Sequence, residues 1–272
     1  MHFTPRLVTV VVAAVTWMAA AAAAQPAPVH HGIETTTRWW SAQAGYDTFA
    51  MRDISRNTRP PDASPISWRG GGPAVWGRYE INRRRSAHLL DVRVAVARDF
   101  AYVAPTRTVE GLRGDRASRF EARYEYRRYF WRDVGFDGFD LALGAQGIGS
   151  REALDRHITP VLFTTTRISG AGGSGIVAAR IRRWQRVQFD AAWANGAVVS
   201  ERSARHSGVP GEAGKHSGGN LLSDTTLRAE WRLTGAMRLS VAWRRYCEMY
   251  GSSHYSYAGV WQSLNAGIVY AR

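Results

Sequence analysis

Cysteine and lysine are almost missing from this sequence. Cys247 is the only cysteine in 272 residues, so no intramolecular disulfide can stabilise the fold. Lys215 is the only lysine; the other basic side chains are arginines, and the formal net charge is +14. These arginines do not form the basic arms or helices that are typical of nucleic-acid-binding proteins. We therefore expect no nucleic-acid partner and a fold that is stable without disulfides.

Long apolar runs are also scarce, with one exception near the N-terminus. Residues 7–24 are largely apolar, follow Arg6 and end in a run of alanines, which is typical of a secretory signal peptide cleaved before Gln25. An uncleaved membrane anchor is the alternative, because this run is about long enough to span a bilayer as a helix. No later segment approaches that length. We expect a signal peptide at 1–24, a periplasmic leader at 25–35 and one domain at 36–272.

Most of that domain alternates between apolar and polar residues, which is the period of a strand with one apolar face. In residues 120–127 (FEARYEYR), for example, Phe120, Tyr124 and Tyr126 alternate with charged residues. Ten segments show the pattern: 38–48, 74–81, 90–97, 120–127, 137–147, 175–183, 187–193, 227–233, 237–244 and 258–270. The sequence therefore predicts an all-β protein of about ten strands.

The predicted connections alternate between short and long. Short ones are expected near 81–86, 132–136, 183–186 and 234–236, and long ones near 49–66, 104–117, 148–173, 196–222 and 249–255. Outer-membrane barrels have short periplasmic turns and long external loops in this way. Residues 158–168 have β-propensity, which leaves twelve strands as an alternative. Residues 150–157 (SREALDRH) would fit one helical turn capped by Ser150.

Aromatic residues lie near the ends of the predicted strands, as in the aromatic girdles of membrane barrels. Trp40, Tyr79, Trp131, Trp193 and Tyr270 are examples. The whole chain after the leader resembles the bacterial outer-membrane β-barrel superfamily. The resemblance implies a closed, antiparallel, up-and-down transmembrane barrel in a Gram-negative outer membrane, reached after export across the inner membrane. It implies membrane lipid and the barrel assembly machinery as partners. A soluble periplasmic β-sandwich that binds a ligand is an alternative, because its strands would alternate too.

The polar face of the predicted strands carries charged side chains of both signs. In a barrel of about ten strands these would fill the interior and pair with one another. The predicted network consists of Arg78, Glu80, Arg93, Glu121, Arg123, Glu125, Arg127, Arg180, Arg182, Arg228, Glu230, Arg232 and Arg244. A filled interior argues against a wide porin. A narrow, porin-like anion pathway stays open, since arginine rings select anions.

Basic residues are also frequent in the predicted long loops. They are Arg52, Arg56, Arg59, Arg107, Arg113 and Arg116. The planar fork of arginine matches the geometry of a phosphate group. We therefore expect lipopolysaccharide or an acidic surface glycan as a partner, with simple solvation of these loops as the alternative. The sequence does not predict an oligomeric state.

One short motif suggests catalysis. His254-Tyr255-Ser256 resembles the His-x-Ser segment of the outer-membrane lipid A deacylases, which implies that Ser256 attacks an acyl ester while His254 removes its proton. In that family an asparagine follows the serine, whereas Tyr257 follows it here, and no Asp or Glu comes after Glu248. A lipid-modifying hydrolase is therefore the alternative to a non-enzymatic function.

The remaining motifs predict no cofactor and no metal site. His30 and His31 are adjacent and point to opposite faces of an extended chain, and His206 and His216 belong to a Gly/Ser-rich loop. The glycines at 170–175 lack the Lys-Ser/Thr of a phosphate-binding loop. We expect a structural or surface-interaction barrel with a charged, filled interior, or a narrow channel.

Overall fold

The computed structural model describes residues 36–55, 66–98, 101–103, 113–132, 138–157, 163–184, 186–206, 214–251 and 255–271. Nearly all of them are in strands. The strands are β1 (Thr37–Ser55), β2 (Ile66–Asn82), β3 (Ser86–Arg98), β4 (Ala101–Val103), β5 (Arg113–Arg132), β6 (Gly138–His157), β7 (Phe163–Arg183), β8 (Val187–His206), β9 (Gly214–Arg232), β10 (Met237–Gly251) and β11 (Tyr255–Ala271). The described residues include no helix that is long and apolar enough to cross a membrane. The predicted signal peptide and leader lie outside the described residues.

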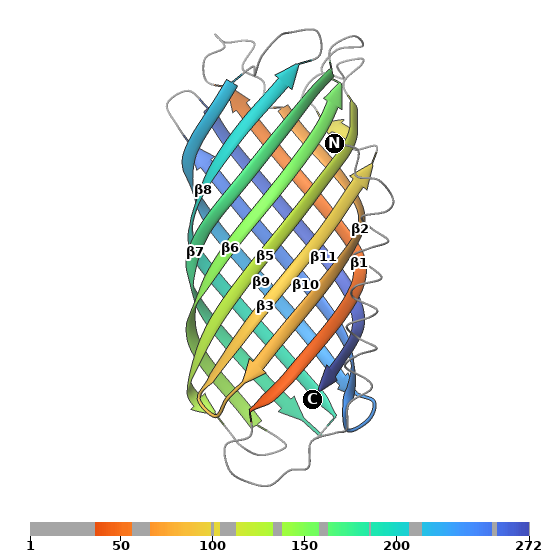
Figure 1. The fold of residues 1–272 in the computed structure, drawn as a ribbon, viewed down its shortest axis with the longest axis vertical. Helices are drawn as coiled ribbons and strands as arrows, with labels where there is room; N and C mark the ends of the chain where they lie inside the picture. Colours follow the sequence, from red (N-terminus) through yellow and green to blue (C-terminus); the bar gives the residue numbers. More distant parts are fainter. Residues whose placement is uncertain are drawn as a thin grey trace.

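The strands form one closed antiparallel barrel (Figure 1). Strand β1 pairs with β2 on one side and with β11 on the other, which closes the sheet. Strand β2 pairs with β3 through Ala74–Asn82 and with β4 through Ser67–Arg69, so β3 and β4 together occupy one strand position. The barrel thus has ten strand positions, and among the described strands closure removes the two free edges that an open sheet would have. The predicted ten-strand up-and-down barrel is confirmed, while the twelve-strand and β-sandwich alternatives are wrong.

The strands are longer than the alternation predicts. Apart from β4 they have 13 to 21 residues, whereas about 9–11 residues are enough to cross a bilayer. Most of the predicted loops at 148–173 and 196–222 therefore belong to β6, β7, β8 and β9. Residues 150–157 are likewise strand rather than a helical turn. The alternation fades there because the outward positions are small or charged, as at Gly147, Gly149 and Arg151.

Most large apolar side chains on the outer wall lie toward the end of the barrel that carries the short turns and the C-terminus, although Val199, Leu221 and Met249 are exposed nearer the long-loop end. On β6, exposed Phe139 and Leu143 lie near that end, and the outward residues farther along are Gly147, Gly149 and Arg151. Other members of this apolar band are Trp40, Tyr46, Leu90, Val92, Phe130, Trp131, Val177, Ile181, Phe189, Trp193, Leu227, Trp231, Leu239, Leu264 and Ile268. The band identifies the part of the wall that suits contact with lipid.

The core of the protein is the inside of the barrel. Because successive side chains of a strand point to opposite faces, every second residue points inward. In β3, for example, Leu89, Asp91, Arg93, Ala95 and Ala97 are buried and the residues between them are less so. The inward residues are mainly charged along the middle of the barrel and mainly apolar toward the long-loop end. This arrangement places a possible functional site in the interior or at either end of it.

Candidate functional site in the barrel interior

Strand β5 carries the central row of interior charges. Its alternate residues Arg119, Glu121, Arg123, Glu125 and Arg127 all point inward and are at most 2% exposed. Arg127 Nη2 binds Glu125 Oε2 at 2.8 Å, and Arg123 Nε lies 3.2 Å from Glu125 Oε1. Neighbouring members of the row therefore neutralise one another along the strand.

Other ion pairs cross the interior and connect strands that are not neighbours in the sheet. Arg123 on β5 reaches Asp224 on β9 at 2.9 Å, and Arg127 on β5 reaches Asp190 on β8 at 3.0 Å. Arg180 on β7 reaches Glu80 on β2 at 2.9 Å. Arg244 on β10 binds both Glu121 and Asp224. The charged side chains thus join opposite walls and fill the space between them.

The charges of the interior nearly balance. Among the described residues, eight arginines and eleven carboxylates are buried. Three further arginines, Arg132, Arg182 and Arg238, are half-buried near the short-turn end and lie within 4.0 Å of Asp140 or Glu230. Such balance is needed because a buried charge without a partner is strongly destabilising. The excess positive charge of the chain is therefore carried outside this network.

The structure places the predicted network as follows. Eleven of the thirteen residues are buried, and Arg182 is half-buried and binds Asp140 at 2.8 Å. Arg232 is different: it is the last residue of β9, and it is exposed at the rim rather than packed inside. Several carboxylate partners, including Asp91, Asp190 and Asp224, are missing from the prediction. Asp91 and Asp190 alternate with apolar residues in the same way as the predicted arginines. The alternation could therefore have identified both of them as inward-facing.

An apolar layer lies inside the barrel toward the long-loop end, and the predicted charged network does not include it. Its residues are Phe49, Met51, Ala97, Ala117, Ile148, Leu154, Val198, Leu222, Tyr246 and Trp261. Arg119 joins this layer to the ionic network: it binds Glu121 and Glu152, and its guanidinium lies 4.2 Å from the Tyr246 ring centre. The prediction missed the layer because Phe49, Val198 and Leu222 fall in segments predicted as loops.

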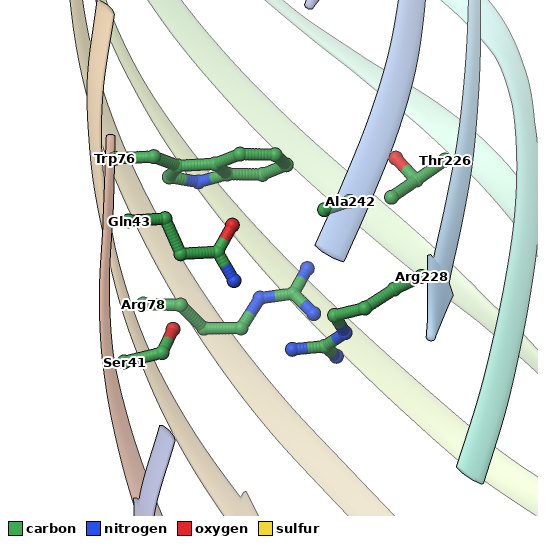
Figure 2. Close-up of a pocket in the computed structure, with 7 residues that line it drawn as sticks. All are labelled: Ser41, Gln43, Trp76, Arg78, Thr226, Arg228 and Ala242. Atoms are coloured by element: carbon green, nitrogen blue, oxygen red, sulfur yellow. The ribbon is translucent and has the colours of Figure 1, made fainter. Parts of the chain in front are cut away.

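Two cavities lie in the short-turn half of the interior. The larger has a volume of about 150 Å³ and is lined by Thr37, Trp39, Glu80, Asn82, Arg132, Arg180, Arg182, Gln188, Glu230, Arg238 and Val269. We call it the vestibule. The smaller has a volume of about 10 Å³ and is lined by Ser41, Gln43, Trp76, Arg78, Thr226, Arg228 and Ala242 (Figure 2). Neither lining includes a residue of the apolar layer.

The predicted catalytic pair is only partly described. His254 lies outside the described residues. Ser256 is the second residue of β11 and pairs with Ile54 of β1 and Gly251 of β10. The hydrolase hypothesis therefore stays a prediction.

Among the described residues, no three His, Cys, Asp or Glu side chains are grouped so that they would hold a metal ion.

Exposed basic side chains lie on the outer wall on the long-loop side of the apolar band. Arg69, Arg98, Arg151, Arg167 and Arg205 are exposed at outward positions of β2, β3, β6, β7 and β8. We call these five residues the outer arginine belt. Of the predicted loop arginines, Arg52, Arg113 and Arg116 lie in β1 and β5, and Arg56, Arg59 and Arg107 lie outside the described residues. The belt itself was not predicted, because most of it falls outside the segments of clear alternation.

Comparison with solved structures shows what this architecture is similar to. The outer membrane protease OmpT from Escherichia coli is 8% identical with a TM-score of 0.61, over 89% of this chain and 99% of that one. The translocator domain of autotransporter NalP from Neisseria meningitidis is 9% identical over 89% of each chain, with a TM-score of 0.42. No family model and no curated protein matches the sequence. At these identities the likeness concerns the fold alone. The chain has a closed antiparallel β-barrel fold that is similar to the fold of OmpT.

Proposed function

We propose that this protein is a closed outer-membrane barrel that acts as a structural and surface-binding protein and not as a pore. The observation that carries the proposal is the filled interior: a balanced ionic network lies in the middle, and the apolar layer crosses the lumen beyond it. The apolar band on the outer wall supports a place in the membrane. In that placement the short turns face the periplasm, and the long-loop half projects beyond the outer leaflet.

The apolar layer is the main barrier to ions. An ion entering from the vestibule would first meet side chains that are already paired, as Arg180 is with Glu80 and Asp190. It would then have to lose its water shell among Phe49, Leu222 and Trp261, which are at most 3% exposed. Hydrophobic constrictions prevent conduction because water and ions leave them. The interior therefore favours a plug over the narrow anion channel.

Conductance in a planar lipid bilayer tests the closed interior. We expect the wild-type barrel to insert without stable conductance steps. In the double variant Phe49→Ala/Trp261→Ala, two large side chains of the apolar layer are removed, and we expect brief openings to appear. A double variant on the outer wall, Phe139→Ala/Leu143→Ala, is the control and should stay silent. Regular anion-selective steps in the wild type would support the channel instead.

The outer arginine belt supports binding to phosphorylated lipid at the outer surface. Guanidinium groups form paired hydrogen bonds with phosphate oxygens, which suits the phosphates of lipopolysaccharide. The belt lies on the long-loop side of the apolar band, which is the side of the outer-leaflet phosphates if the band spans the bilayer. Arg151 and Arg167 belong to the neighbouring strands β6 and β7, so they would reach one lipid together.

Protection of the folded barrel by lipopolysaccharide tests the belt. Folded barrels migrate differently from unfolded ones on a denaturing gel, so the temperature of half-unfolding can be read from band intensities. We expect added lipopolysaccharide to raise this temperature for the wild type and to raise it much less for Arg151→Gln/Arg167→Gln. The control Arg183→Gln/Arg186→Gln removes two exposed arginines at the opposite, short-turn end and should respond like the wild type. Equal protection of all three proteins would remove the belt as a lipid site.

A further inference from the structure

The smaller cavity of the interior has the size of a single bound particle. Its volume of about 10 Å³ is about what one water molecule or one monatomic ion needs. Figure 2 shows how it is built: Trp76, Gln43, Arg78 and Ser41 extend from β1 and β2 on one side, and Arg228 approaches from β9 on the other. The guanidinium groups of Arg78 and Arg228 point toward each other across it.

The side chains around this cavity leave several buried polar atoms without a hydrogen-bond partner among the described residues. Three of these atoms can only donate: Trp76 Nε1, Arg78 Nη1 and Arg228 Nε. The other two are the hydroxyl of Ser41 and Oε1 of Gln43. All five residues are at most 9% exposed. Unsatisfied buried donors are costly, so this concentration of them indicates a bound particle.

The two arginines present these donors because their other nitrogens are already in use. Arg78 binds Asp91 through Nε at 2.5 Å and through Nη2 at 3.0 Å, which leaves Nη1. Arg228 lies 3.4 Å from Glu80 through Nη2 and 3.2 Å from Glu230 through Nη1, which leaves Nε. The ion pairs therefore orient the remaining N–H groups and hold two positive charges at the cavity.

We propose that the cavity binds a monatomic anion, of which chloride is the common example. A water molecule has two lone pairs and can accept from only two of the three obligatory donors, so one buried N–H would stay unpaired. A spherical anion has no fixed number of lone pairs, so it can accept from every donor that reaches it, including the Ser41 hydroxyl. It would also reduce the repulsion between the guanidinium groups of Arg78 and Arg228, because an opposite charge would lie between them.

Gln43 fits an anion after one rotation of its amide. In the present arrangement Nε2 donates to Ser240 Oγ at 2.9 Å, and Oε1 is left without a partner. A half-turn exchanges the two atoms: Oε1 then accepts from the Ser240 hydroxyl, and Nε2 becomes a further donor for the anion. Amide oxygen and nitrogen are nearly the same size, so the packing is unchanged.

The vestibule lies next to this site, on the side of the short turns. Glu80 lines the vestibule and also pairs with Arg228, which lines the small cavity. Four arginines line the vestibule, namely Arg132, Arg180, Arg182 and Arg238, and each of them pairs with at least one carboxylate of Glu80, Asp140, Asp190 or Glu230.

Thermal unfolding in chloride and in gluconate, at equal ionic strength and in detergent, tests the site. Gluconate is too large for the cavity, so only chloride can occupy it. With chloride at about ten times its dissociation constant, we expect the unfolding midpoint to be about 3–6 °C higher than in gluconate. Equal midpoints would mean that the cavity holds water only, and the proposal would be overturned.

A matched pair of tryptophan variants separates specific binding from general salt effects. Trp76 and Trp261 are both buried inside the barrel, and each has an Nε1 without a partner among the described residues, but only Trp76 lines the cavity. Trp76→Phe should reduce the difference between chloride and gluconate, and Trp261→Phe should keep it. The opposite pattern, or equal loss in both variants, would contradict the proposal.

Wild-type crystals grown in bromide give a second measurement: an anomalous peak between Trp76 and Arg228 is expected, and its absence would overturn the assignment.

Discussion

Replacing Arg123 by leucine is expected to destabilise the barrel by about 3–5 kcal/mol, the usual cost of removing one partner from a buried ionic network. Arg123 is 2% exposed and lies against Asp91, Glu125 and Asp224. Each of these carboxylates keeps one other arginine, so the substitution does not isolate any of them completely. It does remove the positive charge at which all three meet, and it leaves the centre of the barrel with an excess negative charge in a region without bulk water.

Equilibrium unfolding in urea, followed by tryptophan fluorescence in lipid vesicles, measures this loss. Arg123→Lys keeps the charge but loses the planar fork that reaches several carboxylates at once, so its free energy of unfolding should fall between those of the wild type and the leucine variant. Arg232→Leu is the control, because this exposed rim arginine should change the free energy by less than about 0.5 kcal/mol. A loss of under 1 kcal/mol for Arg123→Leu would show that the ionic interior contributes little to stability.

The inward and outward residues of most strands could be predicted from the sequence because the interior and, in the proposed placement, the surrounding lipid impose opposite demands on the two faces. Phe120 and Tyr124 are exposed on the outer wall, and Glu121 and Arg123 are buried, as the alternation indicates. A regular strand has a period of two, so a well-patterned segment fixes which residues point inward until a bulge shifts the pattern, as between Gly114 and Arg116 of β5. The charged character of the middle of the lumen follows from the same rule.

Two features could not be predicted, for physical reasons. The pairs that cross the lumen, such as Arg123 with Asp224, depend on strand register and barrel shear, which the alternation of a single strand does not contain. The apolar layer depends on Phe49 and Leu222, which lie in strand segments that extend past the apolar band. In the proposed membrane placement the outward face has no contact with lipid there and need not be apolar, so the alternation that reveals a strand disappears although its hydrogen bonds continue.

The glycines at 170–175 acquire a different meaning in the structure from the phosphate-binding loop considered for the sequence. They lie in the middle of β7, where Gly172 faces Val198 of β8. A Cβ atom on Gly172 would lie 2.6 Å from the Cα of Val198 and even closer to the carbonyl oxygen of Ala197. The backbones of β7 and β8 therefore approach each other more closely than a side chain allows, which is a recognised reason for glycine inside a strand.

Gly172→Ala is accordingly expected to cost about 3 kcal/mol, the upper end of the usual cost of overpacking, because the obstacle is backbone that cannot rotate away. Gly175 lies three residues along the same strand and points outward, and a Cβ there would meet nothing within 4 Å. Gly175→Ala should therefore be neutral or stabilise the barrel by up to about 1 kcal/mol, because alanine restricts the unfolded chain. The yield of folded protein and the urea midpoint, compared between the two variants, measure the difference. If both variants fold equally well, the close approach of β7 and β8 is not required, and the wall can relax by several tenths of an ångström without loss.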